Sequence, residues 1–542
     1  MEKRAWIVPP AQAGRVARLV VGSLLLLPTV VLWGLVLWLP ALRTVALSLQ
    51  SGGFGRAGQF VGLANYVRLL RMPGFGAALV CSLLVAMVRL AAVLAPPALV
   101  GWLGSRSGVR GRAMARLLLG VGLALSAPAG LGLLWRVAVP RAPLLGRLGA
   151  EASGRALLSH LALESVAFLG VGGCLTATAL LLVRHPSRRV AWGLLALAGI
   201  VAVASGLSAL SLSYVAVSGT RLAGEATTLA LRALELAFRD FRLGEGAAGA
   251  SLLLLPTVAL GVVFGLVSER LQLRLVPAGR DVSGSRAASG GVVLAAALLV
   301  LPLVGLYLWG AGEASLYAEG AVGRAASVLT AGPALLNGVV ISVLPILLLQ
   351  LPASYLAALS LTLVRPFGRT GSRIAYVCLL GSGFVPPVAI AIGLFDVARE
   401  AGLLSTFPGA SLPLAAGAAS LFVFRLYFVG KEELWEAARS AGWEGADLLR
   451  LAVSGSGPAF ALAGVVALLV AGQSLVWPLV VLERSELLPL SLQLVARRSQ
   501  LAGAPLTAAG AWLTLTLCGL PILLLWWLLE GLVLHQIELA GS

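Results

Sequence analysis

Two charged residues fall well inside apolar stretches of the sequence, away from their ends, where a charge is a candidate for function. Arg89 lies in the stretch 77–103, and Glu164 lies in the stretch 157–183 with His160 about one helical turn before it. A charge inside a bilayer is costly, so it either contacts a transported solute or pairs with an opposite charge. The sequence leaves both roles open for Arg89 and Glu164.

Other polar side chains in the apolar stretches could form hydrogen bonds with a polar solute. Serines recur at intervals of three before a tyrosine, and a Gln-Ser pair precedes a tryptophan. Serine stripes also make close helix–helix contacts in membranes, and this packing role explains the serines at least as well. The full set of solute-path candidates is Arg89, Glu164, Ser205, Ser208, Ser211, Tyr214, Gln473, Ser474 and Trp477.

No cluster of residues points to catalysis or to a metal ion. The cysteines, at Cys81, Cys174, Cys378 and Cys518, all fall in apolar stretches, and the three histidines are dispersed. The phosphate-binding pattern G-x-x-x-x-G-K-[ST] does not occur in the sequence. We therefore expect no cofactor, no metal ion and no enzymatic activity.

Composition excludes a soluble globular domain. The chain is 59% hydrophobic and only 11% charged, with a mean hydropathy of +0.97, whereas soluble domains are about 45–50% apolar. The apolar runs are about twenty residues long and do not alternate, which indicates helices rather than a barrel. They fall near 19–40, 77–103, 114–135, 157–183, 190–210, 249–268, 291–309, 335–364, 374–395, 411–428, 459–482 and 511–530.

These runs predict an all-α integral membrane protein of about twelve transmembrane helices. The run 19–40 is longer than the apolar core of a signal peptide, so we expect it to be a retained first span. The polar segment 269–290 separates two sets of six runs. The shorter set of loops, which includes the N-terminus, carries the denser Lys and Arg, so we expect both termini to be cytoplasmic. The net charge of +18 comes from scattered arginines, which favours lipid headgroups over nucleic acid as their partner.

One predicted cytoplasmic loop, 431–450, has a regular pattern. Leu434, Ala437, Ala438 and Ala441 share one helical face, and Gly442 then breaks the helix. The acidic side chains of this loop stand at Glu432, Glu433 and Glu436. The pattern indicates a short helix, a turn and a second helix that could dock another protein. The alternative is a solvated connecting loop.

The stretch Glu436-Ala437-Ala438, followed after three residues by Gly442, resembles the EAA loop of bacterial ABC-importer permeases. The stretches 477–482 (WPLVVL) and 487–490 (LLPL) resemble the end of the maltose-type second permease subunit. The stretches 60–66 (FVGLANY) and 237–244 (AFRDFRLG) are similar to parts of the other subunit of that pair. The chain thus resembles two carbohydrate-permease subunits fused head to tail.

This resemblance implies two six-helix MetI-like halves. The first would occupy 1–268, the linker 269–290, and the second 291–542 with its EAA loop at 431–455. It implies import of a sugar or sugar-like solute across the bacterial plasma membrane by alternating access. Its partners would be two cytoplasmic ABC ATPase subunits and an extracytoplasmic solute-binding protein. The residues expected to couple to an ATPase are Glu432, Glu433, Glu436, Ala437, Ala438 and Gly442.

The sequence departs from the family pattern in two places. The first half has only 183–190 (VRHPSRRV) where its own EAA loop should lie, and Ser454-Gly455 replaces the closing Leu-Pro of the second. We therefore expect the two halves to couple unequally. A non-transporting scaffold derived from a permease, a secondary transporter, and an importer of polyamine, iron or thiamine remain alternatives.

Overall fold

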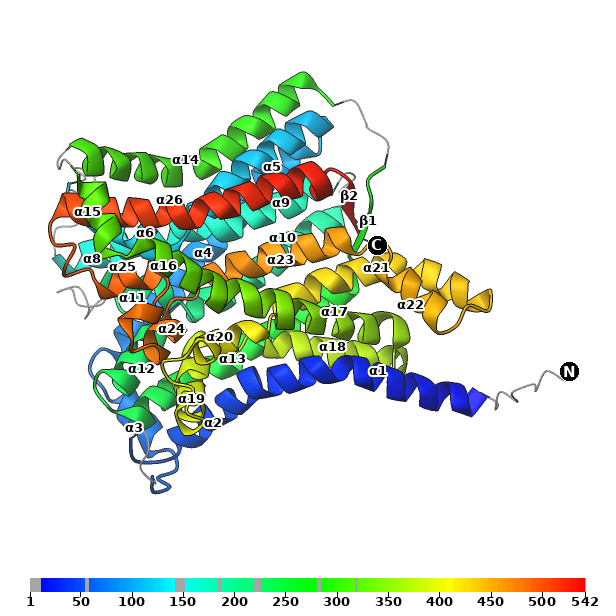
Figure 1. The fold of residues 1–542 in the computed structure, drawn as a ribbon, viewed down its shortest axis with the longest axis horizontal. Helices are drawn as coiled ribbons and strands as arrows, with labels where there is room; N and C mark the ends of the chain where they lie inside the picture. The colour runs from blue at the N-terminus through cyan, green and yellow to red at the C-terminus, as the bar shows by residue number, and fades with distance from the viewer. Residues whose placement is uncertain are drawn as a thin grey trace, which may run out of the picture.

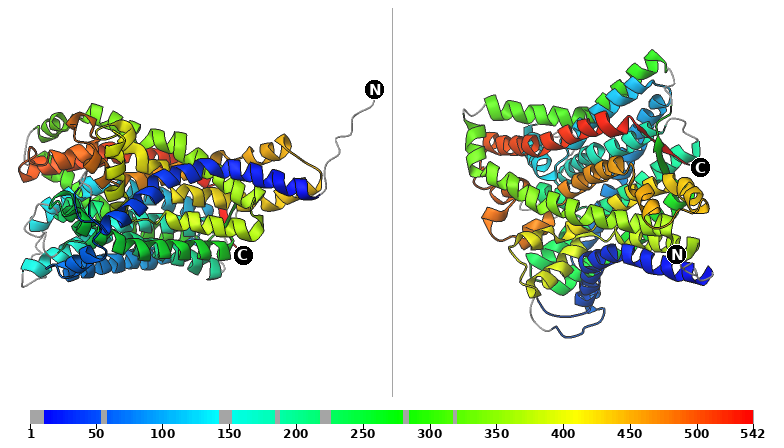
Figure 2. Two further views of the ribbon diagram at one scale, coloured as in Figure 1. Left: turned by 90° about the horizontal axis from the view of Figure 1, so that it is seen from below. Right: turned by 45° about the vertical axis from the view of Figure 1, so that its right-hand side comes forward.

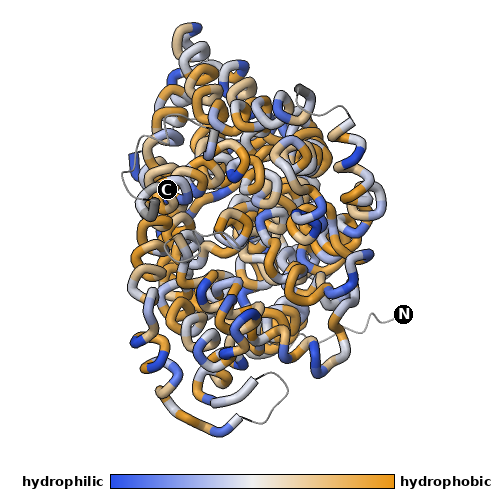
Figure 3. Tube along the Cα trace, turned by 90° about the vertical axis from the view of Figure 1, so that its left-hand side faces the viewer, coloured by the Kyte–Doolittle hydropathy of each residue, from blue (hydrophilic) through white to orange (hydrophobic). Residues whose placement is uncertain are grey.

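The computed structural model describes residues 11–53, 58–141, 152–183, 188–217, 226–279, 284–316 and 320–541. Among these, eight helices are long and apolar enough to cross a membrane, and four bent helix pairs raise the number to twelve if each pair is one span. The long helices lie side by side (Figure 1), and apolar residues predominate along the trace (Figure 3). The prediction of an all-α membrane protein is confirmed.

The first set of elements precedes the segment at 280–283. Its long helices are α1 (Ala11–Trp33) continued by η1 (Gly34–Trp38) and α2 (Leu39–Ser48), α4 (Phe75–Gly104), α5 (Val109–Ala124) with α6 (Pro128–Ala138), α8 (Ala152–Phe168) continued by η3 (Leu169–Gly173) and α9 (Cys174–Leu182), α10 (Arg188–Leu207), and α13 (Leu243–Leu271). The shorter elements are α3 (Ala64–Leu70), η2 (Val139–Arg141), α11 (Ser211–Val217), α12 (Leu229–Phe238) and the strand β1 (Arg274–Pro277).

The second set follows in a similar order. Its long helices are α14 (Arg286–Leu316), α16 (Ala331–Gly338) continued through η4 (Val339–Val343), η5 (Ile346–Gln350), α17 (Leu351–Leu359) and η6 (Ser360–Val364), α18 (Gly368–Ser382) with α19 (Pro387–Glu400), α21 (Ala418–Ser440), α22 (Ala446–Val453) with α23 (Gly457–Gly472), and α26 (Ala504–Leu529) continued by η9 (Glu530–Leu534). The shorter elements are α15 (Ala321–Val328), α20 (Phe407–Ser411), η7 (Leu412–Ala415), α24 (Val476–Val481), η8 (Ser485–Leu487), α25 (Leu490–Ala496) and the strand β2 (Ile537–Ala540).

Two predicted spans are sharply bent rather than straight. The run 114–135 is the pair α5–α6, bent by 76°, and the run 374–395 is the pair α18–α19, bent by 84°. A proline begins the second helix of each pair, and the residue before it, Ala127 or Pro386, has an extended backbone. Proline disfavours the helical conformation of the residue that precedes it, so each helix must stop and restart at this point.

The run 459–482 was predicted as one span and is also interrupted. Helix α23 ends at Gly472 and α24 begins at Val476, so Gln473 and Ser474 lie in a non-helical break. The first set has a matching break between α10 and α11. Each of these breaks therefore joins a long helix to a short one, in corresponding positions of the two sets.

The first span of each set packs against helices of the other set. Helices α1 and α2 lie against α17 and α19, and α14 lies against α4 and α5 (Figure 1). Thr29 donates a hydrogen bond to the carbonyl of Ala353 at 2.7 Å, and Thr44 donates one to the carbonyl of Ala389 at 2.6 Å. A Cβ on Gly393 would lie 1.9 Å from the carbonyl oxygen of Pro40, so only glycine permits the approach of α2 to α19. The two sets are thus interlocked.

The short elements that connect the long helices lie at two opposite ends of the bundle. The helix α22, the strands β1 and β2 and the start of α1 lie at one end, called here the α22 end (Figures 1 and 2). Helices α3, α15 and α25 lie at the opposite end. Between the ends, long helices expose leucines such as Leu24 (62% exposed) and Leu255 (79% exposed), which suits a surface that faces lipid.

Candidate functional site

The segment 431–453 forms two helices that project from the α22 end (Figure 1). Helix α21 continues to Ser440 and α22 begins at Ala446. Gly442 (φ +85°) and Gly445 (φ +53°) turn the chain between them in the left-handed region that glycine adopts most readily. Two glycines therefore set the angle at which α22 returns toward the bundle.

Exposed apolar side chains cover the tip of this element. Leu434 is 54% exposed, Trp443 48%, Leu449 52% and Val453 51%. Ala437 and Ala441 of the predicted face are exposed as well, and Ala438 is half-buried. Several exposed apolar side chains on one projecting element are typical of a protein-binding site.

The acidic residues of the element contact the body of the protein. Glu432 pairs with Arg365, and Glu436 lies 3.3 Å from the same guanidinium. Glu433 pairs with Arg274 at the start of β1, at 2.9 Å. These three carboxylates therefore orient the element on the bundle, while Leu434, Trp443, Leu449 and Val453 remain exposed.

A further set of contacts, which sequence reasoning missed, anchors the return of α22. The Lys431 ammonium donates to the carbonyl of Leu451 at 2.7 Å and to that of Ser454. The hydroxyl of Tyr427 also donates to the carbonyl of Ser454, at 2.9 Å. Lysine commonly satisfies the last carbonyls of a helix in this way. Lys431 is one of the few lysines in this arginine-rich chain, which is the sequence signal that could have drawn attention to it.

The first set has no equivalent element among the described residues. Helix α9 ends at Leu182 and α10 begins at Arg188. Arg184 and Pro186 lie outside the described residues, and Arg189 donates to the carbonyl of Arg270 at 3.3 Å. So short a connection cannot hold two helices and a turn, because one helical turn alone takes 3.6 residues.

Arg89 and Glu164 form an ion pair inside the first set. The Nη2 and Nε atoms of Arg89 lie 2.6 and 3.0 Å from Glu164 Oε2, and Nη1 donates to the carbonyl of Ser205 at 2.9 Å. Ser213 donates to the other oxygen of Glu164 at 3.2 Å, and His160 lies 3.8 Å from that oxygen. Glu164 is fully buried, so this network joins α4, α8, α10 and α11 rather than facing an open path.

The serines of α10 bond within their own helix. Ser205 donates to the carbonyl of Ala202 at 3.1 Å, and Ser208 donates to that of Ala204 at 2.7 Å. Both side chains are half-buried, as is Tyr214. In this conformation the two hydroxyls support packing rather than solute binding.

The remaining candidates lie where the helix breaks of the two sets meet. The hydroxyl of Ser211 accepts from the backbone N–H of Leu475 at 3.1 Å, and Gln473 donates to the carbonyl of Ser126 at 3.4 Å. Ser474, beside them, is exposed. Trp477 is buried and donates to the carbonyl of Gly409 at 3.0 Å, so its ring is part of the core.

Among the described residues, no three His, Cys, Asp or Glu side chains gather in a way that could hold a metal ion. Of the solute-path candidates, Ser211, Gln473 and Ser474 are the ones that lie at the helix breaks. A comparison of the sequence with protein-family models and with curated proteins finds no match.

Proposed function

We propose that this chain is the permease of an ATP-driven ABC importer and moves a sugar or sugar-like solute inward by alternating access. The observation that carries the proposal is the projecting element 431–453, with its glycine turn and exposed apolar tip. The tip would dock a separate ATPase subunit, which this chain needs because it has no phosphate-binding loop of its own.

The arrangement of the two sets supports a transport function. Both contain a bent pair of helices, α5–α6 or α18–α19, and a break before a short helix, α11 or α24. Broken helices that meet at the interface of two repeats are the usual position of a solute site in transporters, because free backbone groups there can contact the solute. Ser211, Gln473 and Ser474 lie at this meeting point and are the candidates for that contact.

The proposal also assigns an orientation. The α22 end faces the cytoplasm of a bacterial cell, with both termini, and two ATPase subunits bind there. The opposite end, with α3 and α25, faces a solute-binding protein. Within this class an importer of polyamine, iron or thiamine is the alternative, and the resemblance of the stretches 60–66 and 477–482 favours a sugar.

A second candidate is a membrane scaffold descended from a permease that no longer transports. The short connection between α9 and α10 favours it, because the described residues of the first set include no docking element. This scaffold would bind an ATPase at one point and show no solute-dependent ATP hydrolysis.

Co-purification tests the proposal. The full chain is isolated from its own organism in mild detergent, and the bound proteins are identified by mass spectrometry. Leu434→Glu places a charge on the apolar tip and should abolish binding of the ATPase. Leu63→Glu is the matched control, since Leu63 is 66% exposed at the opposite end. Absence of an ATPase from the unmodified chain, or its retention by Leu434→Glu, would refute the docking role.

A further inference from the structure

The strands β1 and β2 join the two sets at the α22 end. They pair antiparallel, with Leu275 opposite Leu539 and Val276 opposite Glu538. The backbone N–H of Ala278 continues the ladder to the carbonyl of Gln536 at 2.8 Å. Each strand follows the last long helix of its own set, so the pair joins a segment of the first set to a segment of the second.

Ion pairs between the two sets lie beside this strand pair on each side. Arg116 of α5 binds Glu530 with two contacts, Nε–Oε2 at 2.7 Å and Nη2–Oε1 at 2.6 Å, and both side chains are only 5% exposed. On the other side, Glu269 of α13 lies 2.7 Å from Arg425 and 3.3 Å from Arg373. Both carboxylates lie near the end of the helix that precedes a strand, and both bind arginines of the opposite set. The two ion pairs therefore hold the same interface from corresponding positions.

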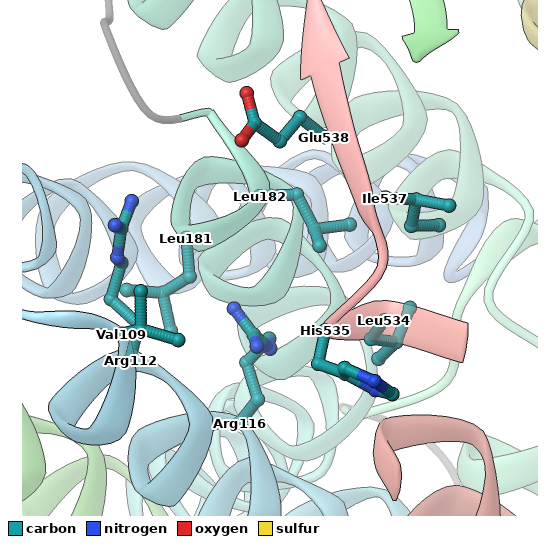
Figure 4. A pocket seen from close by; sticks show the side chains of 9 residues that line it. All are labelled: Val109, Arg112, Arg116, Leu181, Leu182, Leu534, His535, Ile537 and Glu538. Carbon is teal, nitrogen blue, oxygen red and sulfur yellow. The ribbon is translucent and has the colours of Figure 1, made fainter. Parts of the chain in front are cut away.

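The packing around the ion pairs is tight. The pocket beside Arg116 has a volume of about 20 Å³ and is lined by Arg112, Leu534, His535 and Glu538 among others (Figure 4). The pocket beside Glu269 and Arg425 has about 10 Å³. A site of this size admits about one water molecule. Neither pocket is large enough to hold a sugar-sized solute.

The projecting element contacts one of the strands directly. Glu433 pairs with Arg274, the first residue of β1. A Cβ on Gly430 would lie 2.2 Å from the carbonyl oxygen of Leu275, so α21 and β1 are in close backbone contact. The corresponding helix of the first set, α9, packs against β2 and ends at Leu182 without a projecting element. A movement of α21 can therefore reach the strand pair through β1. At β2, the described residues of α9 offer no corresponding projecting element that could transmit a movement.

We propose that β1 and β2, together with the Arg116–Glu530 and Glu269–Arg373–Arg425 ion pairs, form a gate that closes the α22 end, and that α21 moves this gate through Gly430 and Glu433. The inference rests on the proposed function for what passes the gate, namely the imported solute. Two short strands are only marginally stable alone, which suits a contact that must open. The ion pairs supply the remaining stability, and separation of the two sets breaks both at once.

A disulfide tests the closed gate. In the full chain with its four cysteines replaced by alanine, Leu275→Cys and Leu539→Cys are introduced together. The ladder makes this a non-hydrogen-bonded pair, whose Cα atoms lie about 4.5 Å apart, within the range for a disulfide. Oxidation should cross-link them in most molecules, as read by peptide mass spectrometry. The out-of-register pair Val276→Cys with Leu539→Cys is the control and should cross-link poorly, and equal cross-linking of both pairs would overturn the strand pairing.

Hydrogen exchange tests the ion pairs and the link to α21. The full chain is placed in lipid nanodiscs, and exchange is followed in peptides covering 272–279 and 535–541. Glu269→Gln with Glu530→Gln should speed exchange in both peptides by about tenfold, because neutral amides replace the charged contacts. Glu245→Gln is the control, since Glu245 pairs with Arg68 and Arg242 away from the strands. Unchanged exchange in the double variant, or an equal effect of the control, would contradict the gate.

Gly430→Val addresses the contact with α21 alone. Its side chain should displace β1 and speed exchange in 272–279 more than in 535–541, and equal or absent effects would refute the link. None of these measurements needs an ATPase. If the expected cross-linking and exchange are found but the chain binds no ATPase, only the proposed function is contradicted. If the chain binds an ATPase but the expected cross-linking and exchange are not found, only the gate is contradicted.

Discussion

At the scale of single residues, opposite charges on distant segments satisfy one another inside an apolar bundle. The sequence suggested Arg89 and Glu164 as a pair because both fall in predicted spans. It gave no reason to join Arg116 to Glu530, since each residue looks like an ordinary charge at a helix end. Pairs so distant along the chain depend on how the helices assemble, and neither spacing nor hydropathy records that.

The Arg89–Glu164 pair should act on stability. Glu164→Ala leaves a buried guanidinium without its partner, which typically costs about 3–5 kcal/mol of the free energy of unfolding. Arg89→Ala in the same chain removes the uncompensated charge and should restore much of the loss. Thermal unfolding of the detergent-purified chain measures both. If Glu164→Ala unfolds like the unmodified chain but abolishes solute uptake, the residue belongs to the solute path instead.

At the scale of elements, the spans and the turn at Gly442 could be predicted from the sequence, whereas the bends at prolines and the break after Gly472 could not. The long apolar runs marked the spans, and Gly442 marked the turn at 440–446. The bends at Pro128 and Pro387 were missed because hydropathy continues unchanged through a proline. The break after Gly472 carries little signal beyond Gln473 and Ser474, because polar residues are also tolerated within intact spans.

The turn at Gly442 should tolerate asparagine better than a β-branched residue. At φ +85°, Gly442→Val costs about 1–2 kcal/mol of backbone strain, whereas asparagine visits this region more readily. With a bound ATPase, Gly442→Val should therefore lower solute-stimulated ATP hydrolysis strongly, and Gly442→Asn only slightly. Equal activity of both variants would show that the angle between α21 and α22 is unimportant.

The unequal loops of the two sets should produce unequal coupling. Ala437→Arg alters the exposed tip of α21 and should abolish stimulation of the ATPase. Arg188→Gln with Arg189→Gln removes two charges at the start of α10 and should only reduce it, because exposed ion pairs contribute about 0–1 kcal/mol each. ATP hydrolysis by the assembled complex compares them. Equal loss in both would mean that the first set also docks an ATPase.

At the scale of the whole molecule, the sequence predicted that the spans alternate in direction but not which spans are neighbours. The crossing of α1–α2 onto α17 and α19 depends on close contacts such as Gly393 against Pro40. Because small residues occur throughout this chain, the sequence does not indicate which of them make such contacts. The orientation in the membrane remains a prediction from the distribution of arginine and lysine.

Labelling of single cysteines tests that orientation. In sealed cells expressing the chain with its native cysteines replaced, Ser440→Cys at the α22 end should resist a membrane-impermeant thiol reagent. Leu63→Cys at the opposite end should react. Both positions are exposed, so access to the reagent decides the result. The reverse pattern would place the α22 end, and the proposed docking surface, outside the cell.

The interlocked first spans also bear on how the chain is made. When α1 and α2 leave the ribosome, the helices they pack against, α17 and α19, have not yet been synthesised. The first set must therefore wait in the bilayer with part of its packing surface covered by lipid or by an insertion chaperone. A chain divided between residues 279 and 284 should accordingly yield two fragments that are degraded when expressed singly and accumulate when expressed together. Fusion of the two sets guarantees that each arrives with its partner, at equal dose and in the same place.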